Sequence, residues 1–333
     1  MKGRTVRVLS SVAISALFLW FAVRDVDWQE AGRALASARY VGVLPMLAVT
    51  VWTLYIRAQR WRRLLEPVGR PPMRTLVAAT NIGFLANMVL PLRVGEVLRP
   101  VLASRREDLP LSGVLATVVL ERVFDMFTIL FLFGVATLGV PVSAQLRAWG
   151  WTFLVLALVV GAVMGLVRWQ EERSIAVVAG VARLLPPAAG RRAERFFRGF
   201  LQALEVLQSP RAFVRVFLWS LYLWLVIAST YVFGFYTFSL PVPALQGSVT
   251  VATVIAIAVS VPSAPGYVGA FQLGCVLALA LFGVDESRAM AYSIVVHLSQ
   301  FVGVVGAGLY SLWSEGMTFR EVERVSETSD VAA

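Results

Sequence analysis

The chain has 333 residues, of which 58% are apolar, and its mean hydropathy is +0.75. This composition excludes an ordinary soluble domain, and several apolar runs reach the roughly 20 residues that a helix needs to cross a bilayer. Because an open sheet cannot satisfy its backbone in lipid, and the runs lack the alternation of a membrane barrel, the predicted class is an all-α polytopic membrane protein.

The formal net charge is +10, and Lys2 is the only lysine. Arginines concentrate in the connections between apolar runs, which is typical of cytoplasmic loops and of attraction to anionic lipid. The sequence has no nucleic-acid-binding signature, so no nucleic-acid partner is predicted. Cys275 is the single cysteine, which excludes disulfides and thiolate clusters. One histidine with scattered carboxylates supplies no ligand cluster, so neither a metal nor a cofactor is predicted.

The first apolar run, residues 5–23, follows a short basic leader and is interpreted as an uncleaved span that begins in the cytoplasm. Residues 24–39 form either an amphipathic helix on the outer surface or a solvated connector. The second span, residues 40–65, runs into a basic segment and should therefore end in the cytoplasm. The arginines of this segment are Arg57, Arg60, Arg62, Arg63, Arg70 and Arg74.

The next apolar run is interrupted. It begins at Thr75 and meets Pro91 after about 15 residues, or about 22 Å of helix, which is too short to cross. A second short helix, residues 92–103, ends at Arg105 and Arg106. Two short pieces flanked by cytoplasmic charges predict a re-entrant hairpin, which a membrane tolerates only where protein or a polar cavity surrounds it.

Beyond this hairpin, a second interrupted run covers residues 244–284 and is broken by the sequence PSAPGYVG, which predicts another hairpin that enters from outside. The Arg-rich connection 170–211 is predicted to be cytoplasmic, and its amphipathic part lies on anionic lipid or packs its apolar side on the protein. The remaining full spans alternate in direction, and they cover residues 109–140, 149–169, 212–240 and 289–313.

The predicted architecture is about six full transmembrane helices plus two re-entrant broken-helix hairpins. Residues 1–313 form one transmembrane domain, residues 314–333 form a polar cytoplasmic tail, and both termini are cytoplasmic. If each half-segment crossed instead, the count would rise to eight or more and some basic loops would lie outside.

The two halves of the chain also show a faint similarity. About 175 positions separate Arg122 from His297, and Pro91 and Pro265 are similarly spaced. The two hairpins are predicted to enter from opposite sides. This fits an inverted pseudo-repeat, whose interrupted segments point to a transporter's binding site, or a chance similarity of apolar segments.

The first constellation with chemical meaning follows the first break. Arg93, Glu96 and Arg99 are spaced three apart, so they should share one face of the short helix. Pro91 suits the first turn of a helix, whose N-terminus offers free N–H groups and a partial positive charge. With Arg93 in its first turn, such a helix would suit a phosphate or another anionic headgroup.

The second constellation, Glu121, Arg122 and Asp125, lies about 18 Å into its span by helix rise, near the bilayer centre. Ionisable groups at that depth are expensive and therefore indicate function. Three interpretations of Glu121, Arg122 and Asp125 are open. They neutralise Arg93 or Arg99 across a helix contact, they relay a proton, or they form a salt-bridge network that only stabilises helix packing.

The third constellation is Pro265, Gly266 and Gly269, where the helix should restart at about Gly266 with its N-terminus facing the membrane interior. The glycines would permit close backbone approach. Two helix N-termini that converge would make an anion site, and a plain re-entrant turn is the alternative. His297, in the last span, is either a hydrogen-bonded packing residue or a proton-coupling group.

Three motifs together resemble the lysylphosphatidylglycerol synthase transmembrane-region family, which comprises flippase-like membrane proteins. They are Asn87-x-x-x-Pro91-x-Arg93-x-Gly95-Glu96-x-x-Arg99, Glu121-Arg122-x-x-Asp125 and Pro262-x-x-Pro265-Gly266-x-x-Gly269. The resemblance covers about residues 5–313 and implies a bacterial or archaeal inner-membrane protein that moves or presents anionic or aminoacylated lipids, or polyprenyl-phosphate-linked sugars. Only about 20 polar residues follow Trp313, so the soluble aminoacyl-transferase domain of bifunctional members is not expected here.

The expected function is translocation of a phosphate-bearing lipid at a midplane site between the broken helices, without enzyme activity. The chain shows no P-loop and no nucleophilic catalytic set. The alternatives are a non-transporting membrane partner of a lipid-modifying enzyme and a secondary transporter of a small anion. The expected partner is a membrane lipid, and a homodimer or a separate lipid-modifying enzyme is left open. The candidate binding residues are Asn87, Arg93, Glu96, Arg99, Glu121, Arg122, Asp125, Pro265, Gly266, Gly269 and His297.

Overall fold

The computed structural model describes residues 2–90, 93–137, 144–261, 264–319 and 321–322, and every regular element in these ranges is a helix. Six of the described helices hold 22 to 29 residues, so each is longer than the roughly 30 Å of a hydrocarbon core. They correspond to the six predicted spans: α1 (Lys2–Val23), α3 (Val43–Leu65), α6 (Leu111–Thr137), α7 (Ala144–Trp169), α10 (Pro210–Thr237) and α13 (Glu286–Ser314).

Within the described residues, three of these helices also carry a continuous apolar stretch with few charges, namely Tyr40–Leu65, which includes a short 3-10 turn, Pro210–Thr237 and Glu286–Ser314. Helix α6 has the length of a span, but Glu121, Arg122 and Asp125 interrupt its apolar sequence near the middle. The polytopic all-α class predicted from the sequence is confirmed.

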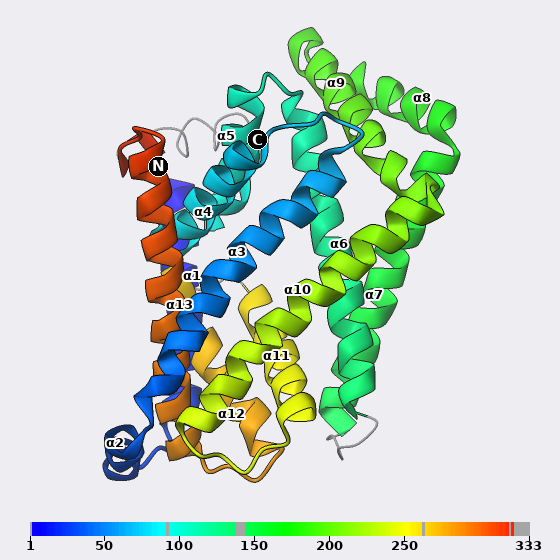
Figure 1. Cartoon of the computed structure of the whole chain (residues 1–333). Helices are drawn as coiled ribbons and strands as arrows, with labels where there is room; N and C mark the ends of the chain where they lie inside the picture. The colour runs from blue at the N-terminus through cyan, green and yellow to red at the C-terminus, as the bar shows by residue number, and fades with distance from the viewer. Residues whose placement is uncertain (1, 91–92, 138–143, 262–263, 320, 323–333) are drawn as a thin grey trace.

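The first predicted hairpin is formed by α4 (Met73–Val89) and α5 (Gly95–Arg106), with 17 and 12 residues. Figure 1 shows α4 entering from the end where α3 finishes and α5 returning to that end. Leu90 leaves the helix in an extended conformation, as expected for the residue before a proline. Pro91 itself lies outside the described residues. The two legs lie in close contact at Gly83 and Gly95, so a side chain added at Gly95 would collide with the backbone of Gly83.

The second hairpin is formed by α11 (Ala244–Ser260), a 3-10 turn (Pro265–Tyr267) and α12 (Ala270–Ala280), and it enters from the opposite end (Figure 1). The helix restarts at Ala270 and not at Gly266 as the sequence suggested. The reason is conformational: Gly266 and Gly269 both have positive φ, 67° and 86°, which interrupts the helix until the following residue. Pro262 lies outside the described residues.

The long helices and hairpins follow the same order twice in opposite directions. The series α3, α4/α5, α6 is repeated as α10, α11/α12, α13, and each hairpin enters from the end where its preceding long helix finishes (Figure 1). Helix α1 begins and α13 ends at one end of the molecule. This arrangement fits the predicted inverted topology, whereas a sequence relationship between the halves stays a prediction.

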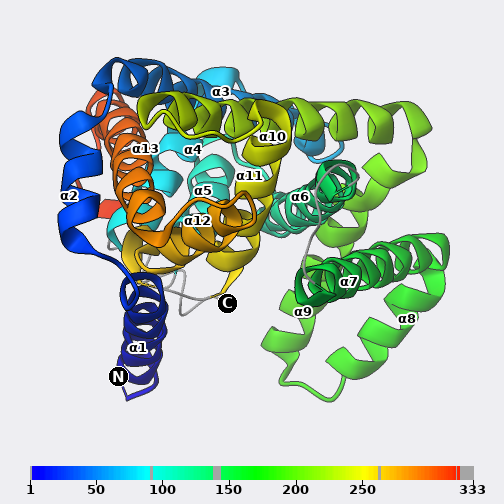
Figure 2. The same cartoon turned by 90° about the horizontal axis from the view of Figure 1, so that it is seen from below.

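The remaining helices are α2 (Trp28–Ser37), α8 (Glu171–Ala182) and α9 (Pro187–Ala203). Helix α2 is the predicted amphipathic helix; Asp27 caps it and Ala31 faces the core. Figure 2 shows α7, α8 and α9 standing to one side of the body. Helix α9 packs Gly199 against Ser112 at the start of α6, so the basic connection uses part of its apolar side on the protein, while Phe196 remains exposed.

The first residues beyond α13 pack on the rest of the protein. Glu315 is nearly buried and pairs with Arg74 and Arg106, which flank the first hairpin. Val322 is fully buried beside Ile82 and Leu98. The segment that follows α13 therefore packs against the α4/α5 hairpin through the carboxylate of Glu315 and the apolar side chain of Val322. The tail beyond Val322 lies outside the described residues.

Candidate functional site

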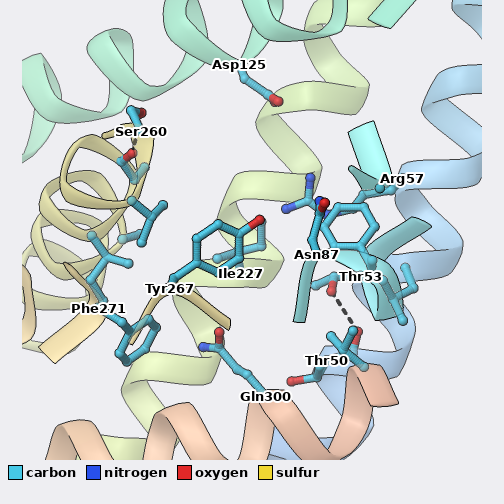
Figure 3. A pocket seen from close by; sticks show the side chains of 18 of the residues that line it. Thr50, Thr53, Arg57, Asn87, Asp125, Ile227, Ser260, Tyr267, Phe271 and Gln300 are labelled. Carbon is cyan, nitrogen blue, oxygen red and sulfur yellow. Dashed lines mark hydrogen bonds between the residues drawn. The ribbon is translucent and has the colours of Figure 1, made fainter. Parts of the chain in front are cut away.

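A cavity of about 430 Å³ lies where the tips of the two hairpins meet, and α3, α6, α10 and α13 complete its wall. Figure 3 shows Arg57, Asn87 and Tyr267 pointing toward one another across it, with Asp125 on the α6 side and Gln300 on the α13 side. The cavity reaches the protein surface, because Arg122 and Ser260 both line it and are both exposed. Its ionisable lining residues are Arg57, Arg93, Glu96, Arg99, Arg122, Asp125, Tyr231, Tyr267 and His297.

Arg93 joins the two hairpin tips. Its guanidinium donates to the carbonyl oxygen of Val261 at 3.2 Å and stacks over the ring of Tyr267 at 5.3 Å. The residue precedes α5 and has a positive φ of 54°, so it does not lie in the first helical turn as predicted. Glu96 occupies that turn, and its carboxylate lies 3.9 Å from Arg93. The N-terminus of α5 therefore lies beside the carboxylate of Glu96 in its own first turn.

Behind the cavity lies a buried ion-pair network that the sequence analysis predicted only in part. Glu121 accepts from Arg99 at 2.5 Å, which confirms the expected contact between α6 and α5. A second partner, at 2.9 Å, is Arg60 of α3. The guanidinium of Arg60 also bonds Asp125, so one arginine bridges both carboxylates of α6.

This network is screened from solvent. Arg60 and Glu121 have fully buried side chains, and Arg99 is 5% exposed. Trp224 of α10 donates to Asp125 at 3.0 Å, and Ser220 accepts from Arg60 at 3.1 Å. The network therefore ties α3, α5, α6 and α10 together, and the packing interpretation of Glu121 and Arg99 fits this geometry best.

Arg60 was missed as a site residue because the sequence analysis assigned it to the basic cytoplasmic end of its span. A signal was available, since Thr50, Thr53, Arg57 and Arg60 recur at intervals of three and four residues, which places them on one helix face. Arg62 lies off that face and is exposed.

Arg57 is the second residue that the sequence analysis missed. Its guanidinium stacks over the ring of Phe84 at 4.8 Å and lines the cavity. Among the described residues no carboxylate lies within ion-pair distance of it. Asn87, predicted to belong to the site, lies beside it with a buried side-chain oxygen that has no partner in the described part of the chain. Arg57 is therefore available to a ligand, whereas the Asn87 oxygen is covered by protein beside Gly95.

Arg122 faces the mouth of the cavity. Its side chain is 44% exposed and lies 3.3 Å from Glu121 and 3.6 Å from Asp125. Arg99 is therefore part of the buried network, whereas Arg122 presents its guanidinium to the cavity.

The second hairpin tip is held by His297. Its Nε2 lies 2.8 Å from the carbonyl oxygen of Gly266, and its Nδ1 lies 2.9 Å from the side-chain nitrogen of Gln272. The ring stacks on Phe271 with 4.4 Å between centroids. With both nitrogens occupied, His297 fits the packing interpretation, although one side of it lines the cavity.

The glycines and the proline of this tip have structural roles. The side chain of Gln272 accepts from the N–H of Gly269 at 2.8 Å, so one of the backbone donors at the start of α12 is already satisfied. Gly269 is needed for contact with α1, because a side chain there would strike the carbonyl oxygen of Ser15. Pro265 and Gly266 form the 3-10 turn against Met88 of the other hairpin. Each helix N-terminus thus lies beside a polar side chain of its own first turn, and an anion site between the two stays a prediction.

The charges around the cavity do not cancel. The lining and the network behind it contain five arginines, Arg57, Arg60, Arg93, Arg99 and Arg122, against three carboxylates, Glu96, Glu121 and Asp125. The described residues therefore leave two positive charges at membrane depth. No group of three His, Cys, Asp or Glu side chains that could hold a metal ion occurs in the described ranges.

Residues 8–308 match the family model described as "Lysylphosphatidylglycerol synthase TM region". The chain belongs to this family. A curated relative from Haloferax volcanii, named glycosyltransferase AglD, is 27% identical over 98% of the chain and 57% of its own length. A relative from Methanothermobacter thermautotrophicus, named UPF0104 membrane protein, is 24% identical over 94% of both proteins. The chain thus spans little more than half of the first relative and nearly all of the second, and it is a membrane protein of this family, as the resemblance implied.

Proposed function

We propose that the protein is a lipid translocase, and not an enzyme, that binds the phosphate of a lipid headgroup in the cavity and moves it across the bilayer. The observation that carries this proposal is an arginine-lined cavity with excess positive charge, placed where two oppositely directed hairpins meet. Arg57, Arg93 and Arg122 present guanidiniums to it, and arginine binds phosphate oxygens in a bidentate manner. Acyl chains would stay in the bilayer outside the mouth at Arg122.

The relatives give limited support for the kind of lipid. One of them is named a glycosyltransferase, so a sugar-bearing, lipid-linked headgroup is one candidate beside an anionic phospholipid. We place the protein in the cytoplasmic membrane with both termini inside, because the basic connections after α3 and α5, and α8 with α9, all lie at the end where α1 begins (Figure 1).

The proposal is tested in vesicles with fluorescent phosphatidylglycerol and phosphatidic acid, by following the fraction that a membrane-impermeant quencher reaches. Arg93→Gln should slow the movement of any transported lipid at least about tenfold, because it removes one phosphate partner and the link between the hairpin tips. Arg33→Gln, an exposed arginine on α2, is the matched control and should leave the rate unchanged.

Equal rates for the wild type and Arg93→Gln would contradict the proposal. Native mass spectrometry of the same proteins separates the alternatives. A lipid that the wild type retains but does not move would favour a non-transporting partner of a lipid-modifying enzyme. Gradient-driven uptake of a small anion, without bound lipid, would favour a secondary transporter.

A further inference from the structure

Two arginines account for the excess positive charge of the cavity, and Arg57 is the first of them. Arg60 and Arg99 are neutralised inside the buried network by Glu121 and Asp125, and Arg93 faces Glu96. Arg57 is held only by the face of the Phe84 ring in the described part of the chain. A guanidinium can be kept in place by an aromatic face without losing its charge. Arg57 therefore contributes an unneutralised positive charge to the cavity.

Arg122 supplies the other unbalanced charge. It approaches Glu121 and Asp125 from the cavity side, but Arg60 already donates hydrogen bonds to both carboxylates. Two carboxylates are thus shared among Arg60, Arg99 and Arg122. Arg57 and Arg122 both line the same cavity, on α3 and α6, so a ligand between them meets two positive charges from two sides.

Unbalanced charge at membrane depth is unfavourable, because hydrocarbon and packed side chains screen it poorly. A ligand with one negative charge would leave part of the excess, whereas a ligand with two would neutralise it. At neutral pH a phosphomonoester carries a charge close to minus two, and a phosphodiester carries minus one.

We propose that the cavity selects a dianionic headgroup, a phosphomonoester or a diphosphate, over a monoanionic phosphodiester, and that Arg57 determines this selectivity. This inference rests on the proposed function, because it assigns the substrate class of the same site. It disfavours an aminoacylated phospholipid as the ligand, since the added amino groups would bring further positive charge into a cavity that already has an excess.

The test is a competition in native mass spectrometry of the full chain in mild detergent. Equimolar phosphatidic acid and phosphatidylglycerol with the same acyl chains are offered to the wild type, Arg57→Gln, Arg57→Lys and Arg62→Gln. Phosphatidic acid has the phosphomonoester and phosphatidylglycerol the phosphodiester. Arg62 lies on the same helix but is exposed outside the cavity, so Arg62→Gln controls for loss of one arginine from α3.

The wild type and Arg62→Gln should retain phosphatidic acid with at least about a tenfold preference, as expected for one additional charge interaction in a site of low polarity. Arg57→Gln should reduce the preference to less than about threefold, and Arg57→Lys should preserve it because it keeps the charge. Agreement of the lysine variant with the wild type would also show that the fold tolerates substitution at this position.

Equal retention of the two lipids by the wild type would overturn the selectivity while leaving lipid binding intact. A preference that survives in Arg57→Gln would overturn the role of Arg57. If the wild type retained neither lipid, the proposed function would fail together with the inference, which is a different result from either of the others.

Discussion

At the scale of residues, two arginines three positions apart on α3 have different environments. Arg60 is completely buried between the two carboxylates of α6 and the hydroxyl of Ser220 on α10. Arg57 lies almost one turn earlier, at the cavity, on an aromatic ring. Breaking a buried ion pair leaves an uncompensated charge and is strongly destabilising. We therefore expect this network to stabilise the fold and to fix the relative positions of α3, α5, α6 and α10. The cavity arginines are those that we propose for binding a ligand.

We therefore expect Glu121→Gln to destabilise the protein by about 3–5 kcal/mol, because Arg60 and Arg99 would lose the carboxylate between them. Glu96→Gln is the matched control. Its carboxylate is 34% exposed and lies 3.9 Å from Arg93, so its loss should change stability by about 1 kcal/mol or less. Denaturant unfolding in detergent micelles measures both. Similar losses for the two variants would mean that the buried network does not stabilise the fold.

Sequence reasoning recognised the charged residues of α5 and α6 but not the arginines that complete the site. The charges of α6 were evident because they interrupt an apolar run. Arg57 and Arg60 stand beside Arg62 and Arg63, and basic residues near the end of a span are ordinarily cytoplasmic anchors. Which of the four point inward depends on the rotation of α3 against α6 and α10, and that rotation is fixed by tertiary packing.

At the scale of elements, both hairpins could be predicted, because a proline and a run shorter than the bilayer thickness are local features. The structure of their tips could not. The start of α12 is capped by Gln272, and the interruption extends to Gly269. These details depend on His297 and on α1, which lie 25 or more residues away from Gln272 in sequence and meet the tip only in the folded chain.

The contact between α12 and α1 yields a prediction about Gly269. Gly269 and Gly283 both have positive φ, 86° and 73°, so alanine at either position should cost about 1–3 kcal/mol of backbone strain. At Gly269 the added carbon would also strike Ser15, whereas nothing lies within 4 Å of it at Gly283. Gly269→Ala should therefore lose clearly more stability than Gly283→Ala and expose α1 to protease.

Thermal unfolding and limited proteolysis in detergent distinguish these contributions. If Gly269→Ala and Gly283→Ala behaved alike, backbone strain alone would account for both, and the approach of α1 to the hairpin would be unimportant. If Gly269→Ala instead remained stable but lost lipid, the close approach would serve a ligand, as the sequence first suggested.

At the scale of the whole molecule, the tips of two oppositely directed hairpins meet at a cavity whose wall α3, α6, α10 and α13 complete. Neither hairpin could exist alone in lipid, because the backbone at each tip leaves the helix. The two tips contact each other. Arg93 of the first donates a hydrogen bond to the carbonyl oxygen of Val261 of the second, and Gly266 of the second lies against Met88 of the first. The cavity is therefore a consequence of the topology, and its charge is supplied by the surrounding helices.

This topology predicts that the loops after the two hairpins lie on opposite sides of the membrane. Arg105, at the end of α5, and Glu286, at the start of α13, are both exposed, whereas Cys275 is fully buried and serves as an internal control. In intact cells an impermeant thiol reagent should label Glu286→Cys but not Arg105→Cys, and the latter should react only after permeabilisation. The unsubstituted chain should stay unlabelled in both conditions. Labelling of both variants from one side would mean that one hairpin crosses the membrane, and reversed labelling would invert the orientation while preserving the fold.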